Sequence, residues 1–119
     1  MTPFGRRLRE MRAERKILMK DMASALSVSS AYLSALEHGN RGRPSSGLVQ
    51  QISAYFNLAW DDVDELKRLA ELSHPRVVVD TAGLSPKATE LANRLSETID
   101  ELSEETIDRL LGTIEQDRR

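Results

Sequence analysis

The chain of 119 residues contains no cysteine, few aromatic residues and only two histidines. Without cysteine it forms no disulfide bond and offers no thiolate metal ligand, and it fits a reducing compartment. No apolar run approaches the roughly 20 residues that span a bilayer, and the N-terminus lacks the apolar core of a signal peptide. We therefore expect a cytoplasmic protein without a membrane partner.

Residues arranged for chemistry are equally scarce. We find no nucleophile with a matching base, no glycine-rich phosphate loop and no cluster of metal ligands. The acidic run Asp61, Asp62, Asp64 and Glu65 is explained by the first turn of a helix, where the helix dipole favours negative charge. We expect no catalytic residue, no metal site and no cofactor, and therefore no enzyme.

Charge divides the chain into two unlike halves. Residues 1–59 carry nine Lys or Arg and four Asp or Glu, a net charge of +5, whereas residues 60–119 carry eight and fifteen, a net charge of −7. The first half can attract phosphate while the second half repels it. The alternative is that the basic residues are only the solvated faces of helices.

The stretch from Ala23 to Gly39 predicts two short helices joined by a tight turn. Ser29 is placed to cap the second helix, and Gly39 is placed to end it in a left-handed turn. Apolar residues at helical spacing form the expected inner faces: Met22, Leu26, Val28, Leu33 and Leu36. Small groups face outward on the second helix: Ser30, Ala31, Tyr32, Ser34 and Ala35. In a helix-turn-helix unit, such a face enters the major groove of DNA.

Residues across the first half of the chain resemble the lambda-repressor-like, Cro or XRE-type family of bacterial regulators. The ordered set is Ala23, Val28-Ser29, Leu33, Leu36-Glu37, Gly39 and Pro44. The resemblance implies double-stranded DNA as the partner and a five-helix domain at residues 1–73. More narrowly, the tyrosine-containing helix and the tail resemble the PraR-like regulators of alphaproteobacteria, which implies control of surface attachment or cell-density signalling.

The resemblance also assigns roles to individual residues. The base-facing positions are Ser30, Ala31, Tyr32, Ser34 and Ala35, and the phosphate-facing positions at the two ends of the helix are Ser29 and His38. Tyr32 either bonds the sugar-phosphate backbone or packs back into the core, and His38 is alternatively a plain C-terminal cap. Arg12 corresponds to an arginine that pairs with the residue at Glu37; the alternative is two unrelated surface charges.

Three positions depart from the family pattern. Relatives place Ser or Thr and then Gln where this chain has Leu18 and Met19, so one helix cap and one phosphate contact are missing. If these two side chains are covered, their packing offsets the lost cap; if they are exposed, they form an apolar contact for a partner. Relatives commonly have Gly where this chain has Ser27, and we expect a looser or differently shaped turn because a left-handed Ser is strained.

A basic loop follows the second helix of the motif, from Asn40 to Pro44. Arg41 and Arg43 are the strongest phosphate candidates, and Gly42 leaves the loop free to follow a phosphate backbone. Further helices are expected to begin at Thr2-Pro3, to span Ile17 to Leu26, and to begin at Ser45. A fifth helix is expected to be capped by Asp61 or Asp62, to run to about Leu72 and to place Trp60 in the core.

The remaining chain predicts a linker at 74–84 and a helical tail at 85–119. The run from Arg76 to Asp80 either pairs with its copy in a second chain or, as we favour, lies extended as a packed linker. Ser85-Pro86 begins one helix, through about Glu101, and Ser103 caps another; each carries an apolar stripe. A hairpin with an apolar stripe on each arm must cover those stripes. It either folds onto its own N-terminal domain or, as we favour because the segment is long, forms a homodimer or higher oligomer through residues 77–116.

These patterns predict an all-α, sequence-specific DNA-binding regulator, expected to act as a repressor that reads an inverted repeat as a dimer. The alternative is an antitoxin-like or adaptor protein that acts through protein contacts. The sequence identifies neither an operator nor a small-molecule effector.

Overall fold

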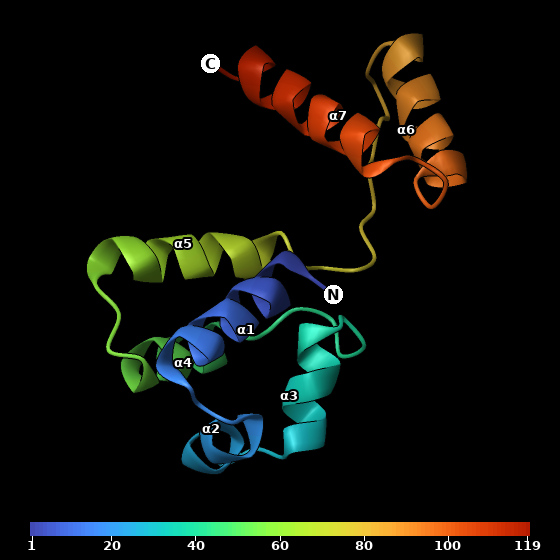
Figure 1. Ribbon diagram of the computed structural model, residues 1–119. Coiled ribbons are helices and arrows are strands. Elements are labelled where there is room, and N and C mark those ends of the chain that lie inside the picture. The colour runs from blue at the N-terminus through green and yellow to red at the C-terminus, as the bar shows by residue number, and fades with distance from the viewer. The chain divides into compact units, whose positions relative to one another are not determined.

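The computed structural model describes residues 1–119 and consists of seven α-helices without a strand. The helices fall into two units, Met1–Val77 and Val78–Arg119, which we call the head and the tail. The head contains α1 (Pro3–Arg15), α2 (Met19–Ala25), α3 (Ser30–Glu37), α4 (Ser46–Tyr55) and α5 (Trp60–Glu71); the tail contains α6 (Pro86–Thr98) and α7 (Glu104–Asp117) (Figure 1). The all-α fold predicted from the sequence is confirmed.

Short polar side chains begin most of the helices. Thr2 caps α1 by accepting a hydrogen bond from the Gly5 backbone N–H at 3.0 Å, and Pro3 follows where the helix needs no donor. Serine hydroxyls do the same at the start of α3, α4, α6 and α7; the capping residues are Ser29, Ser45, Ser85 and Ser103. These starts follow directly from the sequence.

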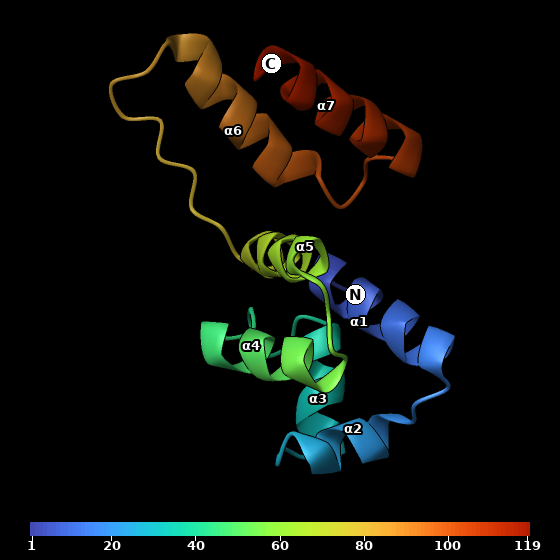
Figure 2. The ribbon, with the colours of Figure 1, turned by 90° about the vertical axis from the view of Figure 1, so that its left-hand side faces the viewer.

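The head has one continuous hydrophobic core to which all five helices contribute. α1 packs against both α3 and α5, α2 packs against α3, and α4 packs against α5 (Figure 2). The fully covered side chains include Phe4, Leu8, Met11, Met22, Leu33, Leu36, Ile52 and Leu66. The core therefore holds the short helices α2 and α3 through their apolar faces, since neither helix would be stable alone.

The start of α5 differs from the prediction. The N-cap residue is Ala59, which makes no side-chain cap bond, and Asp61 and Asp62 lie inside the first turn. Trp60 is 86% exposed and takes no part in the core. At about 100° per residue, Trp60 lies roughly 120° around the helix from Leu66, which is fully buried. The expected cap and the expected burial of Trp60 are both wrong.

A glycine in α1 allows a close approach between two helices of the head. A Cβ atom on Gly5 would lie 2.6 Å from Glu37 Cα and would overlap the Glu37 carbonyl oxygen. The same carbonyl accepts a hydrogen bond from the Thr2 backbone N–H at 3.0 Å. The N-terminal turn of α1 is therefore fixed directly to the C-terminal end of α3.

The tail is a helical hairpin without a buried residue in either helix. α6 ends at Thr98, slightly before the predicted end, and a short turn leads to Ser103 and α7. Large apolar side chains stay more than one third exposed on both helices and at the C-terminal cap of α6: Leu91, Ile99, Leu110, Leu111 and Ile114. The linker is not packed as expected, because Val77, Val78 and Val79 are all exposed.

Replacing Gly5 with Ala should destabilise the protein by about 1–3 kcal/mol, because the added methyl group must push α1 away from α3. The measurement is equilibrium unfolding of the full chain in urea. Gly47→Ala in α4 is the matched control, since nothing lies within 4 Å of its Cβ position. The control should be neutral or stabilising by up to about 1 kcal/mol. Equal effects of the two substitutions would contradict the close approach.

Candidate nucleic-acid interface

α2, the turn after it and α3 form the core of the candidate site. α2 ends at Ala25, and the backbone N–H of Val28 bonds the Ala23 carbonyl at 3.0 Å, which closes the turn. Ser29 then caps α3 through the Tyr32 backbone N–H at 3.0 Å. At the other end, Gly39 has a φ of 83° and the Asn40 N–H bonds the Ala35 carbonyl at 2.8 Å. α3 is therefore a short helix that is fixed at both ends.

The turn keeps its left-handed shape without a glycine. Ser27 has a φ of 58°, and its backbone N–H bonds the Ser24 carbonyl at 3.2 Å. The expectation of a looser turn is wrong, because the packing of α2 on α3 holds the backbone in place. Lys16 repeats the situation at the end of α1, with a φ of 55°. Each residue costs roughly 1–2 kcal/mol in this conformation.

α2 begins at Met19, two residues later than predicted, and its N-cap residue Leu18 makes no side-chain bond. Leu18 is 58% exposed, whereas Met19 is partly buried against the core. The structure thus separates the two side chains: packing covers one of them and leaves the other on the surface.

The outward face of α3 consists of small side chains. Ser30 and Ala31 are exposed, and Tyr32, Ser34 and Ala35 are partly buried. Tyr32 also packs against the hydrophobic core, which supports the core alternative for its ring. On the inner face, Leu33 and Leu36 are buried. Of the five residues predicted to face bases, the first two are therefore the most accessible.

Arg12 of α1 and Glu37 of α3 form an ion pair with 2.8 Å between Nη2 and Oε1. The Glu37 side chain is completely buried, and that of Arg12 is 13% exposed. Arg12 Nε and Glu37 Oε2 have no hydrogen-bond partner. A buried pair of this kind fixes geometry more than it adds net stability, because both charges lose their water. It sets the position of α1 relative to the end of α3.

His38 is the C-terminal cap of α3. Its Nδ1 bonds the Ser34 carbonyl at 2.8 Å while the ring stays exposed. This is the cap arrangement that the sequence left open as an alternative to a phosphate contact. Because the His38 ring is exposed, its bond to Ser34 does not exclude a phosphate contact, and that contact stays a prediction.

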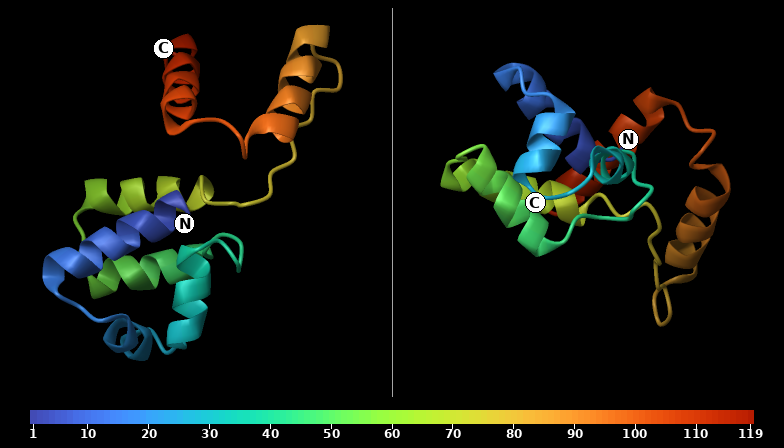
Figure 3. Two further views of the ribbon diagram at one scale, coloured as in Figure 1. Left: turned by 45° about the vertical axis from the view of Figure 1, so that its right-hand side comes forward. Right: turned by 90° about the horizontal axis from the view of Figure 1, so that it is seen from below.

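The loop after α3 carries the two arginines predicted to meet phosphate. Arg41 and Arg43 are exposed, and neither forms an ion pair. Between them Gly42 has a φ of 72° with no atom near its Cβ position. The loop projects from the edge of the head (Figure 3, left). It returns to the core at Pro44, which is buried, and Ser45 caps α4.

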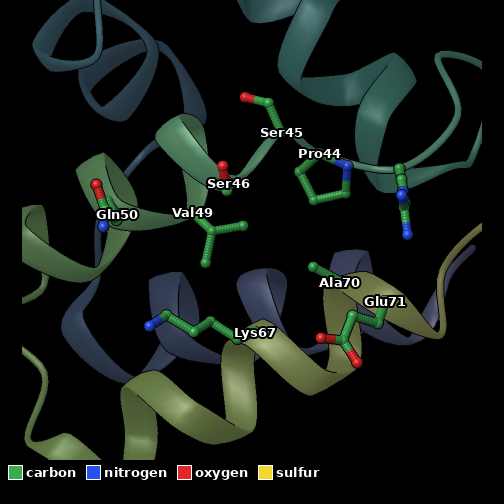
Figure 4. A pocket seen from close by; sticks show the side chains of 9 residues that line it. Pro44, Ser45, Ser46, Val49, Gln50, Lys67, Ala70 and Glu71 are labelled. Atoms are coloured by element: carbon green, nitrogen blue, oxygen red, sulfur yellow. The ribbon is translucent and has the colours of Figure 1, made fainter.

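Two hollows adjoin Ser45 at the start of α4. One, of about 560 Å³, lies between the first turns of α3 and α4 and includes Ser29, Tyr32, Ser45 and Gln51 in its lining. The other, of about 530 Å³, lies between α4 and α5, and Figure 4 shows Lys67 and Glu71 opposite Pro44 and Val49. Sequence reasoning missed Gln51 because nothing in the sequence shows that the starts of α3 and α4 meet.

No group of three His, Cys, Asp or Glu side chains is placed to hold a metal ion. No helix is both long and apolar enough to cross a membrane.

The capped α3, its tight connection to α2 and the core beneath them define the head as an all-α helix-turn-helix module. A family model described as a helix-turn-helix domain matches residues 5–72, more than half of the chain. The chain belongs to this helix-turn-helix domain family and is of the Cro/XRE type, as the sequence resemblance predicted.

Three curated relatives are similar to the head. The "Uncharacterized HTH-type transcriptional regulator RghRB" and the "HTH-type transcriptional repressor RghR", both of Bacillus subtilis, are 33% and 31% identical over 63 and 61 residues. The "HTH-type transcriptional regulator DdrOP3" of Deinococcus deserti is 41% identical over 59 residues. Each match covers about half of this chain and 45% of the relative. No solved structure matches the chain. The narrower PraR-like resemblance stays a prediction.

Replacing Ser27 with Gly should stabilise the protein by about 1 kcal/mol, because glycine adopts the left-handed turn without steric cost. Ser24→Gly, at an exposed position inside α2, is the matched control and should destabilise by up to about 1 kcal/mol. Thermal unfolding of the full chain distinguishes the two substitutions. A loss of stability in both variants would show that Ser27 is not strained.

Proposed function

We propose that the chain is a sequence-specific DNA-binding transcriptional regulator that acts as a repressor. The observation that carries the proposal is a capped helix with an exposed face of short side chains, followed by two exposed arginines without an ion-pair partner. Short side chains allow close approach to base edges in the major groove, and the arginines suit phosphate. The relative named as a repressor, which matches the head, supports the direction of regulation.

The proposed contacts divide by chemistry. Ser30, Ala31, Tyr32, Ser34 and Ala35 face the bases. Hydroxyl groups can bond several base edges and alanine methyl groups can contact thymine, so each contact is individually weak. Ser29, His38, Arg41 and Arg43 face phosphate and supply most of the affinity. With few strong base contacts, sequence choice also depends on DNA shape and bridging water.

The proposed regulator acts as a homodimer on an inverted repeat. The proposed domain boundaries are 1–73 for the DNA-binding domain, 74–84 for a linker and 85–119 for an oligomerising helical hairpin. The exposed apolar side chains of α6 and α7 support the tail as the interface, since so short a unit without a buried residue needs a partner. Two heads related by a two-fold axis meet successive major grooves about 34 Å apart.

A second candidate function is an adaptor or antitoxin-like protein. The exposed Leu18 and the uncovered apolar faces of the acidic tail favour it, because each offers a surface to another protein. This candidate predicts poor DNA binding by the isolated chain, which distinguishes it from the regulator.

Changing Ala31 to Glu should abolish sequence-specific binding while the head stays folded, because a carboxylate would face the bases and phosphates of the groove. The measurement is affinity for a selected DNA site, compared with affinity for unrelated DNA. Ala54→Glu, at an exposed alanine of α4, is the control and should bind normally. Normal binding by the Ala31 variant would move the reading face away from α3.

Changing Arg41 and Arg43 together to Ala should weaken binding to all DNA sequences. Each lost phosphate contact lowers the slope of log affinity against log salt by about 0.9, so the slope should fall by roughly 2 per bound head. The control changes Arg68 and Arg94, which are exposed and pair with glutamates of their own helices. An unchanged slope in the loop variant would rule out phosphate contacts by these arginines.

A further inference from the structure

Three consecutive valines lie at the boundary between the two units and are largely exposed. Val77, Val78 and Val79 are 72%, 96% and 65% exposed. Their backbone groups make no hydrogen bond. Valine has high β propensity, and exposed β-branched residues with free N–H and C=O groups have the character of an unpaired strand.

The segment is fixed only beyond its two ends. On the head side, the Ser73 hydroxyl accepts a hydrogen bond from the Phe4 backbone N–H at 2.8 Å. On the tail side, the Thr81 and Thr89 hydroxyls lie 2.9 Å apart, and the Leu84 N–H bonds the Thr81 carbonyl at 3.0 Å. The stretch in between is therefore available to another strand.

We propose that residues 76–80 pair antiparallel with the same residues of a second copy, with the two-fold axis at Val78. The sequence of the segment is Arg-Val-Val-Val-Asp, and pairing about its centre places Arg76 of each chain opposite Asp80 of the other. Val77 of one chain then lies opposite Val79 of the other, and the two copies of Val78 lie opposite each other. The segment is thus complementary to its own copy in charge and in shape.

The end charges have no other ion-pair partner. Arg76 and Asp80 are exposed and absent from every ion pair of the chain. One oxygen of Asp80 accepts a hydrogen bond from the Ala82 N–H at 2.9 Å, and the second oxygen stays open to an arginine. Opposite charges directly across an antiparallel pair stabilise it, and like charges destabilise it.

Alternation of side chains gives the paired ribbon two unlike faces. Val77 and Val79 of both chains form an apolar face of four valines. The other face has the two Val78 side chains at its centre and an arginine-aspartate pair at each end. A register shifted by two residues would separate these charges, so the charges favour one register over its neighbours.

A ribbon of five residues per chain is too short to hold a dimer alone. This pairing rests on the homodimer proposed above, in which the exposed apolar faces of α6 and α7 supply further buried area. It does not depend on DNA binding. The ribbon would place a two-fold axis at Val78 of the two chains.

Single cysteine substitutions test the register, because the chain has no cysteine of its own. Directly opposed residues have Cα atoms about 4.5–5.5 Å apart, within disulfide range, whereas diagonal residues lie roughly 7–8 Å apart. V78C should therefore form a disulfide-linked dimer under mild oxidation. V77C alone and V79C alone should not form a disulfide-linked dimer. A mixture of V77C and V79C that is allowed to exchange subunits before oxidation should form one.

The oligomeric state of the unmodified full chain is measured first by sedimentation. Asp62→Cys, at an exposed position of α5, reports cross-linking by random collision. A dimer with the stated pattern supports the ribbon. A dimer in which V78C fails to cross-link, or in which V77C and V79C each cross-link equally well alone, overturns the ribbon and leaves the regulator intact. A monomer overturns the dimer and the ribbon together.

A charge swap gives an independent test without oxidation. Arg76→Asp places two aspartates opposite each other at both ends of the ribbon, and the dimer dissociation constant should rise by about tenfold. Asp80→Arg should act alike, and the double substitution should restore the original constant. Single variants that dimerise normally, or a double variant that is as weak as either, would overturn the proposed register.

Discussion

The contact between α1 and the last turn of α3 determines how α3 is held. Three interactions converge on Glu37: the backbone of Gly5 lies against it, the Thr2 N–H bonds its carbonyl, and Arg12 pairs with its buried carboxylate. Two of them involve only backbone atoms, and the third is an ion pair in which the Glu37 side chain is completely buried. The outward face of α3 can then consist of small residues, because the orientation of the helix is set from behind.

Much of the fold follows from short-range signals in the sequence. Ser29 and Gly39 define α3 because a hydroxyl cap and a left-handed glycine act within one turn. Contacts between residues far apart in the chain cannot be predicted in this way: the need for glycine at position 5 arises from the Glu37 backbone 32 positions along the chain.

Other positions also depend on the fold. The apolar character of Trp60 suggests burial, but its angle around α5 puts its side chain on the surface. The pair of Arg12 and Glu37 came from family resemblance, and the position of Gln51 beside α3 came only from the structure.

The two units have different sources of stability. The head covers its own core and tolerates left-handed Lys16, Ser27 and Asn57, whose strain the surrounding packing must offset. The tail buries no residue fully, and apolar side chains of α6 and α7 stay exposed. The basic residues lie mainly in the head and the acidic excess lies in the remaining chain. This division suits a DNA-binding unit joined to an assembly unit.

The outward face of α3 is proposed to select a DNA sequence. The most direct measurement is to incubate the purified full chain with sheared genomic DNA at near-physiological salt, recover the bound fragments and sequence them. If α3 reads bases in a dimer, the fragments should share a recurring inverted repeat with half-sites about one helical turn apart. Recovery of fragments with no sequence enriched above background would contradict this proposal, and would direct attention to the tail and its protein partners.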